Sequence, residues 1–274
     1  MVALSALLVG CTAQTVALTD PGTTRGTTPG QVTRSQVTRS QVTGRQMVQH
    51  PAKGPRHRAV VSHQRIGRSR DGRPIIAWQI GDPRSRHRVV LIAAMHGNEL
   101  AARHILWTLR DGPPVTGADI WLVPTYNPDG AALHQRCNAA NVDLNRNFPT
   151  SWRPQYGSCS AGPRPESAPE TRAAVRFLNR INPDRIVSFH QPFHAVDIQG
   201  FKARPWGRRV ARLLGIPLRH FDCSGTCHGT LTQWFNKNHR GSALTVELGP
   251  SPTWRYLNGY APRRLLRAVG AAYR

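Results

Sequence analysis

The stretch RVVLIAAM at residues 88–95, followed directly by HGNE at residues 96–99, decides the class of fold. Such a nearly continuous apolar run is typical of a strand buried on both faces of a sheet. Similar runs predict further strands at 75–80, 120–124, 186–189 and 243–248, and helical patterns lie between them at 100–109, 168–181, 207–214 and 262–272. This alternation predicts an α/β domain with a mixed, largely parallel central sheet and helices on both faces.

The predicted helix over 168–181 carries start and stop signals. Ser167 and Glu170 have the spacing of a capping box, and Pro183 stops the helix. In parallel sheets, functional sites form beyond the carboxyl ends of the strands. The residues that follow the predicted strands are therefore the first candidates for chemistry.

Length and composition exclude some classes of protein. The chain has 274 residues and a 39% hydrophobic fraction, which is enough for a core. Its longest apolar stretch, within residues 1–10, is about half what a bilayer-spanning helix needs, which excludes a polytopic membrane protein. The net charge of +23 reflects either an arginine-rich composition or an anionic partner such as a cell-wall polymer. No zinc-finger spacing or RNA-binding signature is present, so we expect no nucleic-acid partner.

The N-terminal segment resembles a bacterial lipoprotein signal, because an apolar run ends at Leu8-Val9-Gly10 directly before Cys11. The resemblance implies a lipid on Cys11 and export, with the chain anchored to the outer face of the membrane or secreted. It lacks the positively charged start of export signals, which a misassigned start site would explain. Residues 12–57 contain three near-copies of a pentapeptide and read as a disordered linker. We expect a signal segment at 1–11, this linker at 12–57 and a catalytic domain at 58–274.

Four residues at predicted strand ends could carry chemistry. His96 and Glu99 follow the strand at 88–95, His190 ends another strand, and Glu247 lies near the end of a third. Alone, each could be a strand-end histidine or a helix-capping glutamate. Together, two histidines and one carboxylate have the composition of a catalytic zinc site with an open position for water. Glu247 is then left to act as a general base.

The remaining cysteines number four, Cys137, Cys159, Cys223 and Cys227. In an exported protein an even number favours disulfides, and we expect Cys137 with Cys159 and Cys223 with Cys227. The alternatives at Cys227 and the adjacent His228 are a nucleophilic pair or a zinc cluster. Adjacent residues point apart and no orienting partner is evident, so both are disfavoured.

Five segments, in this order, resemble the zinc carboxypeptidase family: HGNE at 96–99, NPDG at 127–130, VDLNRNFP at 142–149, the strand-end His190 and TVEL at 245–248. The resemblance runs from about Ala59 to the C-terminus and implies that family's fold. The pairing of Cys137 with Cys159 also resembles a disulfide of the digestive members of the family.

The resemblance also implies roles for individual residues. One Zn²⁺ per chain would be held by His96, Glu99 and His190, with Glu247 taking a proton from the activated water. Arg136 would face the carbonyl oxygen and stabilise the negative charge that develops on it in the transition state. The substrate carboxylate would be held by Asn145 and Arg146.

Two departures from the digestive members bear on the substrate. The catalytic region is only about 215 residues long, and no tyrosine lies between His190 and Glu247. The chain is most similar to compact bacterial members, murein peptide amidases, which cleave the bond between γ-D-glutamate and meso-diaminopimelate. A peptide or peptidoglycan fragment is the expected substrate, and Asp197 is our candidate for its ammonium group. His194 is four residues after His190, a helical ligand spacing, but Pro192 argues against a helix there.

The sequence leaves three alternative functions open. The first is a general metallocarboxypeptidase acting on ordinary peptides. The second is a zinc deacylase of the aspartoacylase or succinylglutamate desuccinylase type, which shares the HGNE-like start and a DLNR segment. The third is a non-catalytic wall-binding lipoprotein. The complete NPDG and LNRNFP segments and the four candidate residues favour a zinc peptidase, expected to be a monomer that touches the membrane only through its lipid.

Overall fold

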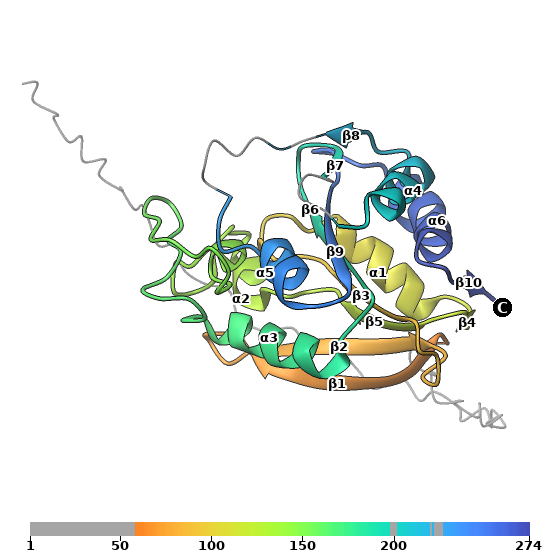
Figure 1. Ribbon diagram of the computed structural model, residues 1–274, viewed down its shortest axis with the longest axis horizontal. Coiled ribbons are helices and arrows are strands. Elements are labelled where there is room, and N and C mark those ends of the chain that lie inside the picture. Colours follow the sequence, from red (N-terminus) through yellow and green to blue (C-terminus); the bar gives the residue numbers. More distant parts are fainter. Residues whose placement is uncertain (1–57, 198–201, 220, 222–226) are drawn as a thin grey trace, which may run out of the picture. The chain divides into compact units, whose positions relative to one another are not determined.

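The computed structural model describes residues 58–197, 202–219, 221 and 227–274 (Figure 1). The expectations for Cys11, for the segments 1–11 and 12–57, and for Cys223 lie outside the described residues. No helix in the described part of the chain has both the length and the apolar character needed to cross a membrane.

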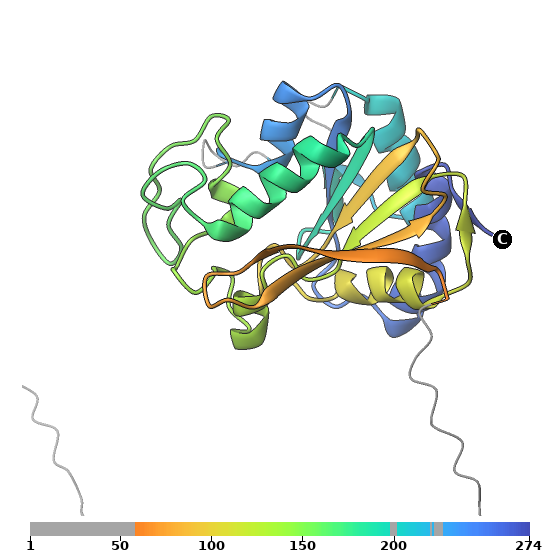
Figure 2. The same cartoon turned by 90° about the horizontal axis from the view of Figure 1, so that it is seen from below.

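A mixed eight-stranded sheet forms the centre of the described part of the chain (Figure 2). Its strand order is β1-β2-β5-β3-β6-β9-β7-β8, and the four central strands β5, β3, β6 and β9 are parallel. The bounds are β1 Val60–Arg68, β2 Pro74–Gly81, β3 Arg88–Ile92, β5 Asp119–Val123, β6 Arg185–His190, β7 Ala195–Asp197, β8 Leu218–Arg219 and β9 Ser242–Glu247. Two short strands, β4 Val115–Thr116 and β10 Ala272–Tyr273, pair separately.

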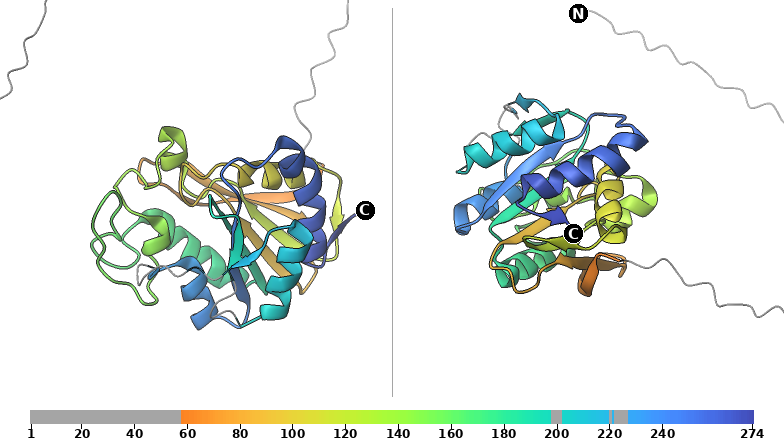
Figure 3. Two further views of the ribbon diagram at one scale, coloured as in Figure 1. Left: turned by 90° about the horizontal axis from the view of Figure 1, so that it is seen from above. Right: turned by 90° about the vertical axis from the view of Figure 1, so that its right-hand side faces the viewer.

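Helices cover both faces of this sheet, over two separate apolar cores (Figure 3). One core holds α1 (Ala102–Asp111), α4 (Arg204–Leu214) and α6 (Ala261–Ala268), and the other holds α3 (Pro169–Ile181) and α5 (Leu231–Asn238). Each helix buries an apolar stripe, as the 3.6-residue period requires, and its charged residues are exposed or half-buried, with the exception of the buried Glu170 on α3. The remaining helical elements are α2 (Pro128–Leu133), a 3₁₀ turn (Leu144–Arg146) and a π turn (Tyr256–Tyr260).

The predicted class of fold is confirmed, and the five predicted strands are found within a few residues of their expected bounds. The differences are one shorter helix and several elements that the sequence does not predict. The predicted helix over 262–272 ends at Ala268, because the chain turns at Gly270, whose φ is +80°, and returns as β10. The sequence predicts neither strand β1 nor helix α5, nor the short elements β4, β7, β8, β10 and α2.

The predicted capping box at Ser167 and Glu170 is wrong. The N-cap of α3 is Ala168, with no side-chain cap. The Glu170 carboxylate instead accepts hydrogen bonds from the Arg70 backbone N–H (2.9 Å) and from Asn138 Nδ2 (3.1 Å). A buried tertiary network has replaced the local cap, because a carboxylate with no exposed surface needs donors wherever they lie.

Parallel pairing brings three strand ends to one edge of the sheet. β3 pairs with β6 so that Ile92 lies opposite Ser188, and β6 pairs with β9 so that His190 lies opposite Glu247. The segment that follows β3 therefore leaves the sheet beside His190. The candidate residues meet at the carboxyl edge, as expected for a sheet of this type.

Candidate active site

The segment after β3 is shaped by close packing against α2. Glu99 closes a tight turn by donating its backbone N–H to His96 O (3.1 Å), and the Gly97 N–H donates to Arg136 O (3.3 Å). A Cβ on Gly97 would lie only 1.9 Å from the carbonyl carbon of Gly130. Only glycine permits this approach, so the HGNE turn and the NPDG segment act as one unit.

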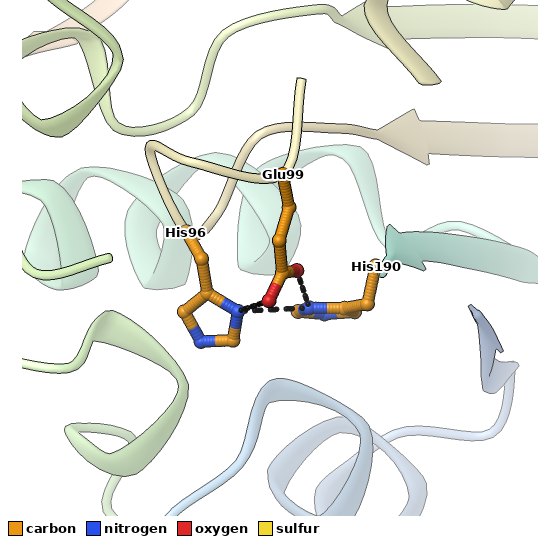
Figure 4. A group of neighbouring side chains, drawn as sticks. All are labelled: His96, Glu99 and His190. Carbon is orange, nitrogen blue, oxygen red and sulfur yellow. Dashed lines mark hydrogen bonds and ion pairs between the residues drawn. The ribbon is translucent and has the colours of Figure 1, made fainter. Parts of the chain in front are cut away.

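His96, Glu99 and His190 form a compact donor group (Figure 4). The Nδ1 atom of His96 lies 2.8 Å from Glu99 Oε1, and the Nδ1 atom of His190 lies 3.0 Å from Glu99 Oε2. The two Nδ1 atoms are 3.2 Å apart. All three side chains are buried, and one ligand atom from each lies within 4.8 Å of the others.

This donor set fits a zinc ion. Two imidazole nitrogens and one carboxylate converge on one point, which is the ligand composition of a catalytic zinc site with room for a fourth ligand. No other group of this kind occurs among the described residues.

The Nε2 atom of each histidine, which points away from the donor group, also has a hydrogen-bonding partner. His96 Nε2 lies 3.1 Å from Asp143 Oδ1, and His190 Nε2 lies 3.0 Å from Ser188 Oγ. Such contacts fix the tautomer and ring orientation of metal-binding histidines. Sequence reasoning assigned no role to Asp143, although it belongs to the VDLNRNFP segment. The signal that could have found it is a carboxylate in the same motif as two candidate substrate-binding residues.

The charges of the cluster stabilise one another. Burial alone would raise the pKa of Glu99, but hydrogen bonds from His190 and His96 hold it far below its ordinary value. Burial would likewise raise the pKa of Asp143, and the positive charges of His96 and Arg136 instead lower it strongly. For His96, burial opposes protonation, yet Asp143 and then Glu99 raise its pKa overall. Both carboxylates are therefore ionised across the neutral range, as metal binding and histidine orientation require.

Arg136 lies beside the cluster. Its Nε and Nη2 donate to Asp143 Oδ2 at 3.1 and 3.0 Å, and its Nη1 donates to Glu99 Oε1 at 3.2 Å. Its side chain is 38% exposed, so the guanidinium lies between the buried carboxylates and the solvent. That position places a fixed cation next to the donor group.

Arg146 is a half-buried cation with unused hydrogen-bonding capacity. Its Nη1 donates to the backbone oxygen of Asn145 (2.8 Å), but its Nε is buried without a partner. Burial lowers the pKa of Arg146, partly offset by the nearby Asp143. The Asn145 Oδ1 accepts the Leu231 N–H at the start of α5 (3.1 Å). Asn145 thus ties the 3₁₀ turn to α5, and Arg146 has donors left for an anion.

Glu247 lies on β9 directly opposite His190. It is 8% exposed, and its Oε2 is buried without a hydrogen-bond partner. Burial raises the pKa of Glu247, the charge of His190 lowers it, and Glu99 raises it further. A desolvated carboxylate with a free oxygen beside the donor group has the properties of a general base.

Asp197 lies on the same side of the sheet as Glu247, whereas His194 lies outside the donor group. Asp197 on β7 pairs with Thr245, two residues before Glu247, so all three project from the same side of the sheet. His194 has a φ of +47° and donates its N–H to Leu248 O (3.2 Å). It is not part of the donor group, which agrees with the expectation that Pro192 disfavours a ligand pair there.

The disulfides follow the expectation as far as the structure describes them. Cys137 and Cys159 are joined, with their Cα atoms 5.7 Å apart. Cys227 is also disulfide-bonded, so it offers no thiol for a nucleophilic pair with His228. The Cys137–Cys159 bond closes the loop that carries Asp143 and Arg146.

Comparison with known proteins places this site in a family. The zinc carboxypeptidase family matches residues 53–112 and 113–196, and the chain belongs to that family. The resemblance seen in the sequence is thereby confirmed.

Several relatives are murein peptide amidases. Murein peptide amidase A of Escherichia coli K12 is 34% identical over 149 residues, covering 49% of this chain and 61% of that protein. Murein peptide amidase A of Vibrio campbellii is 27% identical over 209 residues, covering 70% and 81%. The chain therefore spans less than two thirds of the E. coli relative.

Solved structures show the same fold. The murein-tripeptide amidase MpaA of E. coli O157 superposes with a TM-score of 0.60 and 28% identity over 77% of this chain and 90% of that chain. Carboxypeptidase A of Helicoverpa armigera superposes with a TM-score of 0.66 at 18% identity, covering 77% and 68%. The second likeness concerns the fold alone.

Proposed function

We propose that this chain is a zinc-dependent peptidase that hydrolyses the bond between γ-D-glutamate and meso-diaminopimelate in peptidoglycan peptides. The observation that carries the proposal is the buried donor group of His96, Glu99 and His190 beside Glu247, whose Oε2 has no partner. Bound zinc supplies a Lewis acid that lowers the pKa of water and polarises a carbonyl group. We propose one such ion per chain and a monomeric enzyme.

The roles of the surrounding residues follow from their positions. Glu247 accepts the proton of the attacking water and delivers it to the leaving amine, which its unpaired oxygen and raised pKa favour. Arg136 stabilises the negative charge that develops on the carbonyl oxygen, since its guanidinium lies beside the donor group at the solvent side. Arg146 and Asn145 bind the carboxylate next to the scissile bond, because the buried Arg146 Nε has no partner.

The choice of a murein peptide as substrate rests on two supports. Relatives at 34% and 27% identity and a solved structure at 28% identity carry the name murein peptide or murein-tripeptide amidase. Diaminopimelate bears an ammonium as well as carboxylates, and Asp197 lies on the same side of the sheet as Glu247. We propose that Asp197 pairs with that ammonium.

We further propose that the chain is exported and either held at the outer face of the membrane by a lipid on Cys11 or secreted. The apolar run before Cys11 supports this location. The Cys137–Cys159 bond supports it as well, because disulfides persist in oxidising compartments. Mass spectrometry of the N-terminal peptide would detect the lipid.

The test uses the full chain loaded with zinc and the tripeptide L-Ala-γ-D-Glu-meso-diaminopimelate, with products read by mass spectrometry. We expect chelator-sensitive release of diaminopimelate. Glu247→Gln should bind the same amount of zinc and lose about 10²- to 10⁴-fold in turnover. Asp197→Asn should raise KM for the tripeptide more than for the same peptide ending in an ordinary amino acid.

Other results of this test would indicate a different activity or a different base. Trimming of a C-terminal peptide library without release of diaminopimelate would show a general carboxypeptidase. Hydrolysis of acylated amino acids alone would show a deacylase. An active Glu247→Gln variant would refute the assigned base.

A further inference from the structure

An arginine-rich face covers helices α4 and α6, away from the donor group. These helices pack side by side over one face of the sheet (Figures 1 and 3). Their exposed or half-buried arginines are Arg204, Arg208, Arg209, Arg212, Arg263, Arg264 and Arg267. Residues 202–219 and 248–274 contain no Asp or Glu side chain, so this positive charge has no acidic counterpart on the same elements.

A pocket of about 480 Å³ opens on this face. Arg263, Arg264 and Arg267 line it together with Tyr260 and Tyr273. Among the described residues, no ion pair joins any of these three arginines to a carboxylate, and two of them contact aromatic rings. The guanidinium of Arg264 lies 4.1 Å from the centre of the Tyr260 ring, and that of Arg263 lies 5.7 Å from the centre of the Tyr273 ring.

These ring contacts decide what kind of anion suits the pocket. A guanidinium over a tyrosine face is held by the ring quadrupole while its N–H groups remain available as donors. Forked N–H donors match phosphate oxygens two at a time. Arg264 lies over the Tyr260 ring, which also stacks on Tyr256, and Arg263 lies over one face of Tyr273. These rings therefore offer little open surface for the base stacking by which single-stranded nucleic acids are bound.

The shape of the pocket favours a polymer over a membrane surface as the binding partner. A polymer strand can enter a concave pocket, whereas a flat bilayer surface meets only its rim. A basic surface that inserts into a bilayer also presents large apolar side chains beside its cations. On α6 the exposed positions are the arginines Arg263 and Arg267, and Leu265 and Leu266 are buried. The exposed aromatic residue beside them is Tyr260, and the guanidinium of Arg264 lies over its ring.

The pocket lies at the opposite edge of the sheet from the donor group. Tyr273 on β10 pairs with Val115 on β4, shortly before β5 begins at Asp119, which lies opposite Arg88, the first residue of β3. The donor group follows the other end of β3. A polymer in the pocket would therefore leave the proposed active site open.

From the pocket, its three arginines and its position, we infer a second binding site on this protein, which takes a linear polyanion whose charges are phosphodiester groups. Binding there would hold the enzyme on an anionic polymer while the active site works on a separate chain. The inference does not depend on the reaction that the active site carries out.

The experiment measures binding of the full chain to fluorescently labelled poly(glycerol phosphate) by anisotropy at 50 and 200 mM NaCl. We expect Arg263→Ala/Arg267→Ala to weaken binding at 50 mM about tenfold or more, and to reduce the slope of log Kd against log salt by about 2, one for each lost arginine. The matched control is Arg65→Ala/Arg176→Ala, which removes two exposed arginines from β1 and α3. It should change Kd less than about twofold.

A second variant separates charge from geometry. Arg263→Lys/Arg267→Lys keeps both charges but loses the forked donors, so its Kd should fall between those of the alanine variant and the unmodified chain. Equal weakening in the pocket and control variants would overturn the inference, because it would show that net charge alone binds the polymer. Tighter binding to vesicles of anionic phospholipid or to single-stranded RNA than to poly(glycerol phosphate) would also overturn it.

Discussion

Replacing Asp143 by alanine should weaken zinc binding although Asp143 is not in the donor group. Its Oδ1 holds His96 Nε2 at 3.1 Å, and its Oδ2 receives two donors of Arg136. Loss of such a contact to a ligand histidine typically costs 10- to 100-fold in metal affinity, or about 1.4 to 2.7 kcal/mol. Arg136 also keeps its contact with Glu99 Oε1, so after the change its guanidinium should compete with the metal for that oxygen. We therefore expect an effect near the upper end, about 100-fold.

The assay is competition for zinc between the full chain and a chromophoric chelator. Asp119→Asn is the matched control, because Asp119 is also a buried aspartate but lies at the opposite edge of the sheet, where it accepts a hydrogen bond from Gln79. It should leave the zinc Kd within about twofold. A zinc Kd for Asp143→Ala equal to that of the unmodified chain would refute the orienting role of Asp143.

Three further predictions concern the site. Gly97→Ala should abolish zinc binding and lower the free energy of unfolding by about 3 kcal/mol, since its Cβ would lie 1.9 Å from a backbone carbon of α2. Gly259→Ala, whose Cβ meets nothing within 4 Å, should change neither zinc binding nor the midpoint of chemical denaturation. Arg146→Met should lower kcat/KM for the tripeptide about 100-fold, and an equal loss on a substrate with that carboxylate amidated would contradict the assignment. Because burial raises the pKa of Glu247, the acid limb of kcat/KM should lie above 4.5, with activity falling as pH drops through it and the base is protonated; a limb below 4.5 in a pH titration would count against Glu247.

The central strands could be predicted because they are buried on both faces. Strand β3 is apolar at nearly every position, and a run of this kind is typical of a strand covered on both sides. Strand β1 is an edge strand whose residues are mostly exposed, so its sequence lacks an apolar run long enough to predict a buried strand. Helix α5 has only eight residues, too few for a clear helical period, although Thr230 and Gln233 form a capping box at its start. Short or exposed elements owe their conformation to their neighbours, which a local pattern does not show.

The candidate ligands were found because strand ends and residue types coincide there. His96, Glu99 and His190 come together as the parallel pairing of β3 with β6 requires. The contacts of Asp143 could not be predicted in the same way, because they depend on the conformation of the loop that the Cys137–Cys159 bond closes. The Glu170 error has a similar origin: its partners, Arg70 and Asn138, are 100 and 32 residues away in sequence.

The central position of β6 has a consequence for assembly of the protein. His190 must be placed between His96, 94 residues earlier, and Glu247 on the far neighbouring strand. The entropy of closing such long loops is lost before the contacts between their ends stabilise the fold. This part of the sheet is therefore expected to form slowly. The ion can bind tightly only after the two distant segments that carry its donors, 96–99 and the end of β6, are in register, so zinc uptake would report a late step of folding. Bound zinc would then add RT ln(1 + [Zn²⁺]/Kd) to stability, because the unfolded chain has no such preformed group.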